Sequence, residues 1–106
     1  SGGMKKRISI ARALISKPEI IFYDEPTTGL DPIMADSITK LIIDMRKKYK
    51  TTSITVTHDI KLASRISDRI ALIDNGTITE IGTFEELRQN SKNQLIKSFL
   101  IAEEAK

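Results

Sequence analysis

Cysteine and tryptophan are absent from the 106-residue sequence, and histidine occurs only once. Without cysteine the chain forms no disulfide and no thiolate metal site, a composition that fits a reducing compartment. Long apolar runs are missing too, since none approaches the roughly 18 to 20 residues that span a bilayer. No segment has the phosphate-binding form Gly-x-x-x-x-Gly-Lys-Ser/Thr. The residues present therefore provide no disulfide scaffold, no membrane-spanning helix and no P-loop.

The charge balance is mildly basic, because 17 lysines and arginines face 14 acidic residues and give a formal net charge of +3. The basic residues are interspersed with acidic ones, so nucleic acid is not predicted as a partner. Apolar residues make up 40% of the chain, which is typical of a folded protein and not of a disordered one. The sequence opens on Ser-Gly-Gly without an initiator methionine, and we expect it to be the rear part of a longer protein.

Helical and extended segments alternate along the chain, which predicts an α/β fold. Helical spacing of apolar residues predicts a helix over 3–16. The bulky run 19–23 does not alternate, and it predicts a strand covered on both faces, as in a parallel sheet. A helix is expected from Asp31-Pro32, which supply a capping carboxylate and a first-turn proline. The β-branched run 52–57 predicts a second strand.

The second half of the chain is predicted to contain a short helix, a hairpin and further helices. The short helix is expected over 60–66, and Asn75-Gly76 is typical of a tight hairpin turn between strands 69–73 and 77–81. Thr83 followed by Glu86 forms a capping box that opens another helix. A last amphipathic helix is expected from Leu95, Ile96, Phe99 and Leu100. We expect residues 1–90 to form one structural part and residues 91–106 a helical tail.

Two adjacent acids, Asp24 and Glu25, end the first predicted strand, at the edge where open α/β sheets bind ligands. One of them can hold a hydrated Mg²⁺ while the next orients or deprotonates a water; a simple surface pair is the alternative. If the two strands run parallel, His58 follows the second strand at that same edge. A lone histidine is more often structural, but here it can bond a phosphate oxygen or the attacking water.

Glycines occur in the sequence both before and after the two acids. Gly2 and Gly3 precede a helix whose first turns carry Lys5, Lys6 and Arg7, and helix N-termini attract anions. Taken alone, Ser-Gly-Gly is weak evidence, most often a flexible chain start. Gly29 lies in a turn between the two acids and the helix that begins at Pro32.

In this order the motifs resemble the rear part of the nucleotide-binding domain of ABC (ATP-binding cassette) transporters, and the resemblance extends to about residue 90. The matching segments are Ser1-Gly2-Gly3-Met4 for the signature motif, Ile20 to Asp24 for the Walker B strand, Glu25 for the catalytic glutamate, Gly29-Leu30-Asp31 for the D-loop and His58 for the switch histidine. Met4 in place of the usual glutamine, with the run 23–33, is similar to the ATPases of Mla/Mce-type lipid transport systems.

The resemblance implies a head-to-tail dimer with ATP sandwiched between two ABC ATPase subunits. Ser1, Gly2 and Gly3 would contact the γ-phosphate held by the partner, and Gly29, Leu30 and Asp31 would pass between the two sites. Asp24 would hold Mg²⁺ through water, Glu25 would activate the attacking water, and His58 would sense the γ-phosphate. The cofactors implied are ATP and Mg²⁺. The implied partners are a membrane permease and a Mce-type substrate-binding protein, on the cytoplasmic side of the cell membrane.

Because the phosphate loop is missing, we expect the chain alone to hydrolyse no ATP. The family's Walker A strand, which would lie beside the strand that ends at His58, is missing as well, so we expect an unpaired sheet edge, an exposed apolar face and partial aggregation. Two other functions stay open. One is a soluble ABC protein of translation or repair, and the other is a non-catalytic remnant that docks on intact cassettes.

Overall fold

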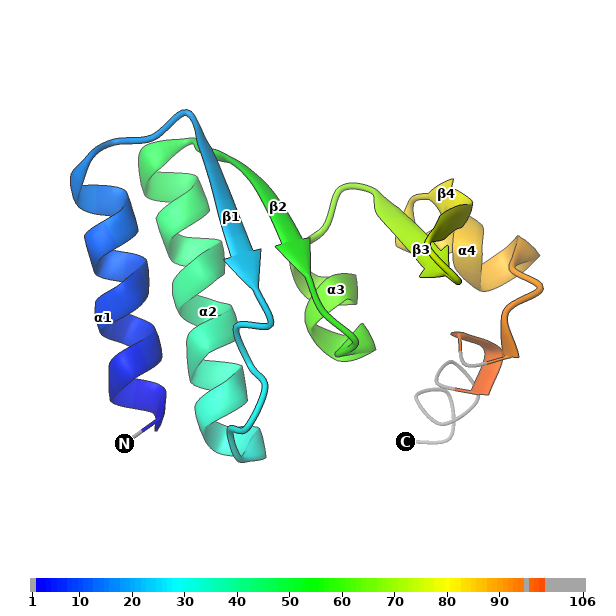
Figure 1. The fold of residues 1–106 in the computed structure, drawn as a ribbon, viewed down its shortest axis with the longest axis horizontal. Helices are drawn as coiled ribbons and strands as arrows, with labels where there is room; N and C mark the ends of the chain where they lie inside the picture. The colour runs from blue at the N-terminus through cyan, green and yellow to red at the C-terminus, as the bar shows by residue number, and fades with distance from the viewer. Residues whose placement is uncertain (1, 95, 99–106) are drawn as a thin grey trace. The chain divides into compact units, whose positions relative to one another are not determined.

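A computed structural model describes residues 2–94 and 96–98, and the chain divides into two compact units, Ser1–Ile66 and Ser67–Lys106. The first unit contains α1 (Gly2–Ile15), β1 (Ile20–Asp24), α2 (Pro32–Tyr49), β2 (Thr52–Val56) and α3 (Ile60–Ile66). The second contains β3 (Ile70–Asp74), β4 (Thr77–Gly82) and α4 (Phe84–Asn90) (Figure 1). No helix among the described residues has the length and apolar character needed to cross a membrane.

The first unit is built on a β1–α2–β2 crossover. Strands β1 and β2 pair in parallel, with Ile20 opposite Thr52 and Asp24 opposite Val56. Parallel neighbours need a long connection, and α2 provides it, as a crossover helix does in α/β proteins. Both strand arrows point toward the end of the unit at which α1 begins (Figure 1). The α/β fold predicted from the sequence is confirmed, and with it the parallel arrangement of the two strands.

Helix α2 begins and ends where its sequence specifies. The Asp31 carboxylate accepts a hydrogen bond from the Met34 backbone N–H at 2.8 Å, and Pro32 occupies the first helical turn. At the other end Lys50 adopts a left-handed conformation with φ of 52°, and its N–H donates to the Arg46 carbonyl at 2.8 Å. The last turn carries Arg46, Lys47 and Lys48, where cations favour the helix dipole. The predicted cap at Asp31 is therefore confirmed.

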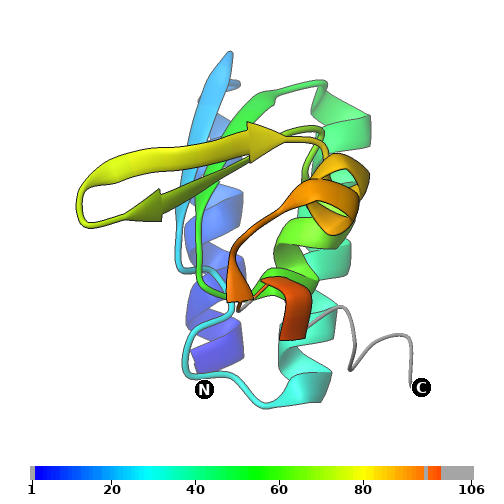
Figure 2. The same ribbon diagram turned by 90° about the vertical axis from the view of Figure 1, so that its right-hand side faces the viewer.

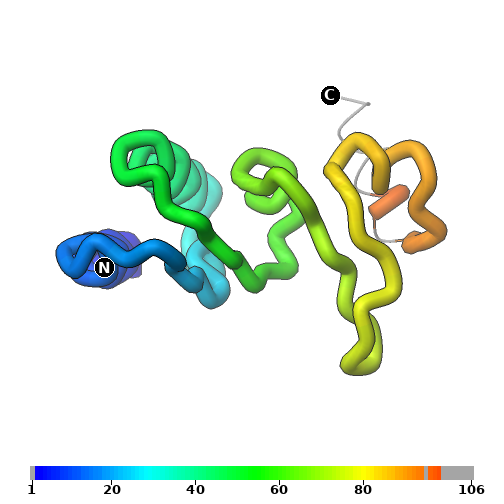
Figure 3. The backbone as a smooth tube through the Cα atoms, turned by 90° about the horizontal axis from the view of Figure 1, so that it is seen from above, coloured from blue at the N-terminus to red at the C-terminus, as the bar shows by residue number. Residues whose placement is uncertain are grey.

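One apolar core fills the first unit between its helices and one face of the sheet. Ile38 on α2 is fully buried and Leu62 on α3 is 1% exposed. Figure 3 looks at α1 and α2 from above, where the two helices lie beside each other. The buried core residues are Ile10, Leu14, Ile21, Tyr23, Ile38, Ile42, Leu62 and Ile66.

Only one face of the β1–β2 sheet is covered within the described residues, so the prediction of a strand covered on both faces is wrong for β1. Ile21 and Tyr23 are buried, whereas Phe22 on the other face is 69% exposed. Because paired residues of parallel strands share a face, Ile54 and Val56 extend this exposed apolar surface. An apolar run marks a strand as hydrophobic on both faces but does not itself supply a cover for each. The exposed apolar sheet face expected from the sequence is present.

The second unit is a hairpin followed by a helix (Figure 2). Asn75 and Gly76 both have positive φ, 50° and 75°, which is the backbone of the tight turn that Asn-Gly predicts. Helix α4 starts at the predicted capping box: Thr83 accepts from the Glu86 N–H at 3.1 Å, and the Glu86 carboxylate accepts from the Thr83 N–H at 3.0 Å.

The chain after α4 is described only in part. Ser91 donates to the Glu80 carboxylate at 2.9 Å, and residues 94 and 96–98 are helical, with Ile96 buried. Leu95, Phe99 and Leu100, which the sequence places on a last amphipathic helix, lie outside the described residues. The division into 1–90 and a tail of 91–106 stays a prediction.

Candidate active site

The two predicted acids and the histidine meet at the carboxyl end of the parallel strands. Asp24 is the last residue of β1, Glu25 follows it, and His58 comes two residues after β2. His58 Nδ1 lies 2.9 Å from Glu25 Oε1, although 33 residues separate them along the chain. The His58 side chain is 79% exposed and that of Glu25 is 32% exposed, so both remain accessible from solvent. A carboxylate and an imidazole in direct contact can share a proton and orient a water molecule.

Glu25 has a constrained backbone. Its φ of 49° lies in the left-handed region, which costs a residue other than glycine about 1 kcal/mol or more. Its N–H donates to the Val56 carbonyl at 2.8 Å and so prolongs the pairing between the strands by one residue. Its own carbonyl accepts from Thr28 N–H at 3.3 Å, closing the turn that begins at Pro26. Strand pairing on one side and the turn on the other thus fix the residue.

Both carboxylate oxygens of Glu25 have partners. Thr28 Oγ1 donates to Oε2 at 2.8 Å, and His58 contacts Oε1. The hydrogen bond from Thr28 and, after it, the contact with His58 hold the pKa of Glu25 below its ordinary value. A lowered pKa keeps this carboxylate ionised near neutral pH, which is the form that accepts a proton.

Asp24 differs from its neighbour in having no side-chain partner in the part of the chain that the structure describes. Its side chain is exposed and makes no hydrogen bond or ion pair with the described residues. A free carboxylate at a strand end suits Mg²⁺, which keeps most of its waters and takes one or two carboxylates beside the phosphates of a substrate. Among residues 2–94 and 96–98 no group of three or more acidic, histidine or cysteine side chains could hold a metal by itself. The donor set therefore fits a hydrated Mg²⁺ that is shared with a nucleotide.

The turn from Pro26 to Asp31 joins this edge to α2. Gly29 has φ of 79°, a conformation that side chains rarely adopt, and a Cβ there would meet no atom within 4 Å. The backbone conformation is thus the reason for glycine at this position. Asp31 caps α2 with one carboxylate oxygen, as described above.

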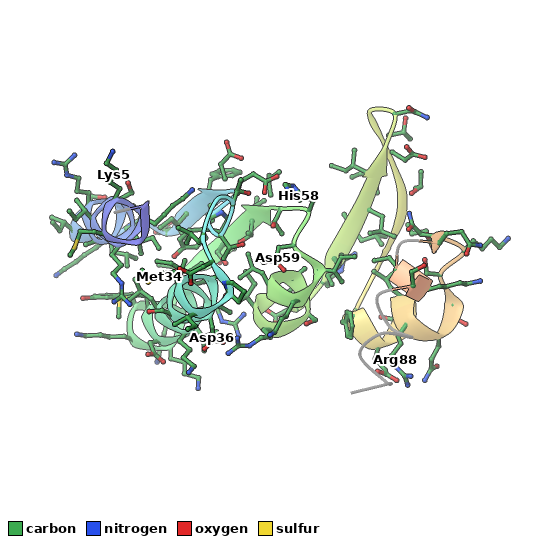
Figure 4. The ribbon with its side chains drawn as sticks, turned by 90° about the horizontal axis from the view of Figure 1, so that it is seen from below. Lys5, Met34, Asp36, His58, Asp59 and Arg88 are labelled. Carbon is green, nitrogen blue, oxygen red and sulfur yellow. The ribbon has the colours of Figure 1, made fainter. Side chains whose placement is uncertain are left out.

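Thr27 and Asp59 connect the turn to the start of α3. Thr27, only 6% exposed, donates from Oγ1 to Asp59 Oδ2 at 2.8 Å. The other oxygen of Asp59 accepts from the Leu62 N–H at 3.1 Å and so caps α3. Figure 4 shows Asp59 at the start of α3, next in the chain to His58. One carboxylate thereby joins the turn after Glu25 to the segment that carries His58.

Replacing Thr27 with valine tests this connection. The change keeps the side-chain shape but leaves Asp59 Oδ2 without its donor, so we expect unfolding in urea to require about 1 to 3 kcal/mol less free energy. Thr52→Val is the matched control, because Thr52 is exposed on β2 and its side chain makes no hydrogen bond with the described residues. Equal losses of unfolding free energy in the two variants would show that the hydrogen bond from Thr27 to Asp59 does not stabilise the fold.

The beginning of α1 packs closely against this region. Gly3 is buried, and a Cβ at this position would overlap the end of the Met34 side chain on α2, labelled in Figure 4. A Cβ on Gly2 would lie 3.3 Å from Leu30 in the turn. Arg7 on α1 donates to Ser37 on α2. The two glycines thus let α1 approach the turn and α2, whatever they do toward a phosphate; Ser1 lies outside the described residues.

The structure brings Glu25 and His58 into contact, and Asp24 beside them has no side-chain partner within residues 2–94 and 96–98. Four residues that connect this site were not predicted: Lys6, Thr27, Thr28 and Asp59. Lys6 Nζ donates to the Glu25 carbonyl at 3.0 Å. Only Thr28 had a local signal, since a threonine three residues after an acid across a proline turn can bond back to it. The other contacts join distant parts of the chain.

Comparison with known proteins gives one consistent result. Residues 1–28 match the family model described as ABC transporter. The chain is 40% identical to the methionine import ATP-binding protein MetN of Haemophilus ducreyi, covering 94% of this chain and 29% of that protein. It is 41% identical to the phosphate import ATP-binding protein PstB 2 of Lactobacillus acidophilus, covering 94% of this chain and 39% of that protein. The chain thus spans well under half the length of these curated relatives.

A solved structure agrees with these relatives. The ATP-binding cassette MJ0796, in a dimeric post-hydrolysis state bound to ADP and Pi, superposes with a TM-score of 0.68 at 35% identity. The match covers 78% of this chain and 35% of that one. The chain therefore has the fold of part of an ABC ATPase, and its sequence is similar to those of ABC transporter ATP-binding proteins. The two curated relatives are named for the import of methionine and of phosphate. They therefore give no support to the narrower resemblance to lipid-transport ATPases.

Proposed function

We propose, from the ABC-cassette fold that the chain shares with these relatives, that it supplies part of the ATP-hydrolysing site of an ABC transporter. The observation that carries the proposal is the contact between Glu25 and His58 at the carboxyl end of two parallel strands, with Asp24 free beside it. These three side chains come from two strand ends that the α2 crossover brings together. An acceptor for a water proton and a free Mg²⁺ ligand are two of the groups that hydrolysis of a phosphoanhydride requires.

Each residue has a distinct role in this proposal. Glu25, ionised near neutral pH, accepts a proton from the water that attacks the γ-phosphate of ATP. His58 orients that carboxylate and would sense the γ-phosphate. Asp24 would hold Mg²⁺ through a water; when bound, the ion neutralises charge on the phosphate oxygens. The products are ADP and phosphate.

The remaining residues would act across an interface between two subunits. Ser1, Gly2 and Gly3 would contact the γ-phosphate bound to the partner subunit, and Gly29, Leu30 and Asp31 would cross between the two sites. Gly2 is exposed and Gly29 has open space around it, which suits a close approach by a second molecule. A membrane permease would be the other partner, and binding to it would place the complex at the cytoplasmic face of the membrane. A Mce-type partner and a lipid cargo rest only on Met4 and the run 23–33.

An exchange experiment tests the proposal. The matched segment of PstB 2 is replaced by this chain, and ATP hydrolysis is measured for the chimera and for the 106-residue chain alone. We expect the chimera to hydrolyse ATP with Mg²⁺ and the chain alone to show no activity, because the sequence contains no phosphate-binding loop.

Two results would contradict this expectation. A folded chimera that binds ATP but hydrolyses none would argue for a non-catalytic remnant. Hydrolysis by the chain alone would show that a phosphate loop is unnecessary here. Removing Mg²⁺ with a chelator should abolish the activity of the chimera, and a chimera that stays active would show that Asp24 has no metal to hold.

A further inference from the structure

Helix α1 contacts the backbone of the candidate base directly. Lys6, in the first turns of α1 and half-buried, donates from Nζ to the carbonyl oxygen of Glu25 at 3.0 Å. The same carbonyl accepts from the Thr28 N–H at 3.3 Å, so a helix and a turn share one acceptor. Nineteen residues separate Lys6 from Glu25, and the contact is therefore a tertiary one.

In the part of the chain that the structure describes, the ammonium group of Lys6 bonds to the backbone and not to an acid. Lys6 forms no ion pair with an acid among the described residues, and its one bond there is to the backbone. A hydrogen bond from an ionised donor is stronger than a neutral one, so the ammonium group fixes where that carbonyl points.

The carbonyl in question belongs to the residue with the least relaxed backbone of this edge. With φ of 49°, Glu25 needs its neighbours to hold it, and the peptide orientation decides where its side chain leaves the strand. Among the described residues that side chain bonds to two others, Thr28 at 2.8 Å and His58 at 2.9 Å. A rotation of the peptide would move the carboxylate away from both.

We propose that Lys6 is a positioning residue, which holds the Glu25 peptide in its left-handed conformation and so keeps the carboxylate at His58. The inference deepens the proposed function and rests on it for the role of Glu25. It also implies that a shift of the start of α1 reaches the candidate base through a single hydrogen bond. In this arrangement α1, the helix whose glycines would face the partner's nucleotide, controls the carboxylate of its own subunit.

The test compares Lys6→Met, which keeps the length of the side chain and removes the donor, with Lys6→Arg, which keeps a donor. Lys5→Met is the matched control, because Lys5 is the exposed neighbour on the same turn of α1, labelled in Figure 4. In the PstB 2 chimera we expect Lys6→Met to lower kcat about tenfold or more, with KM for ATP changed less than about twofold. Lys6→Arg should recover most of the loss, and Lys5→Met should behave like the parent.

A second measurement uses the PstB 2 chimera without nucleotide and needs no hydrolysis. The ¹³C signals of the Glu25 side-chain carboxyl and of its backbone carbonyl are compared between variants by NMR at one neutral pH. We expect Lys6→Met to shift the backbone carbonyl signal, because that carbonyl loses its donor, and to shift the carboxyl signal, because the carboxylate moves away from Thr28 and His58. Lys5→Met should leave both unchanged.

The two measurements separate the inference from the proposed function. If Lys6→Met lowers the melting temperature but leaves the Glu25 signals and kcat unchanged, Lys6 only stabilises the fold and the inference is overturned. Equal losses of kcat in Lys5→Met would overturn it as well. An inactive parent chimera would count against the proposed function, while the NMR signals of Glu25 still decide whether Lys6 positions that residue.

Discussion

Glu25→Gln is expected to lower the rate of ATP hydrolysis by the PstB 2 chimera by about 10² to 10⁴, while ATP still binds. The amide has nearly the shape of the carboxylate but accepts no proton from the attacking water. Thr28 can still donate to the amide oxygen, so the turn should keep its conformation. Nucleotide binding is measured with a fluorescent ATP analogue, and hydrolysis by release of phosphate.

Glu19→Gln is the control for this substitution, because Glu19 is exposed immediately before β1 and loses the same charge. It should hydrolyse ATP like the parent chimera. If Glu25→Gln retained the parent rate, the proton would go elsewhere, and the proposed role of Glu25 would be wrong. If ATP binding were lost together with hydrolysis, the effect would reflect nucleotide affinity and would equally refute that role.

Ile38→Ala is expected to have the largest effect on stability, a loss of about 2 to 5 kcal/mol in the free energy of unfolding. Ile38 is fully buried on α2, where the helix faces the sheet. Removing three carbons leaves a cavity, and a unit of this size has only a small core to stabilise it. Chemical unfolding of the 106-residue chain, followed by circular dichroism, measures the change.

Ile33→Ala provides the comparison on the same helix, since Ile33 is 82% exposed and undergoes the same substitution. We expect its loss to be within about 0.5 kcal/mol of zero. Similar losses at both positions would mean that helix propensity and not packing sets the effect, and that Ile38 is not a core residue in solution.

Local signals in the sequence predicted the elements of the fold well. The cap at Asp31, the tight turn at Asn75-Gly76 and the capping box at Thr83 each involve residues at most three apart, so their chemistry is visible in a short window. The position of the candidate site was predictable too, because parallel strands end at the same edge. That rule predicted Glu25 and His58 at one edge, but not the hydrogen-bond contact between them.

Contacts between distant residues were not predictable in this way. Lys6 reaches the Glu25 carbonyl across 19 residues, and Thr27 reaches Asp59 across 32. Neither pair has a sequence pattern, because a carbonyl acceptor exists at every residue and a threonine is common in turns. The exposed face at Phe22 escaped prediction from the strand alone for a related reason, since burial depends on what packs against a residue.

The pairing of β1 with β2 also sets a tolerance for the site. Each residue along a strand advances the chain by about 3.3 Å, so a one-residue slip between β1 and β2 would displace His58 from Glu25 by more than a hydrogen bond can span. Such a slip would also turn every side chain of one strand to the opposite face. The alternation of Ile21 and Tyr23 toward the core resists it, because a shifted strand would carry them into water. The hydrophobic pattern of β1 therefore fixes the register of the two strands, and with it the position at which the Glu25 carboxylate contacts the His58 imidazole.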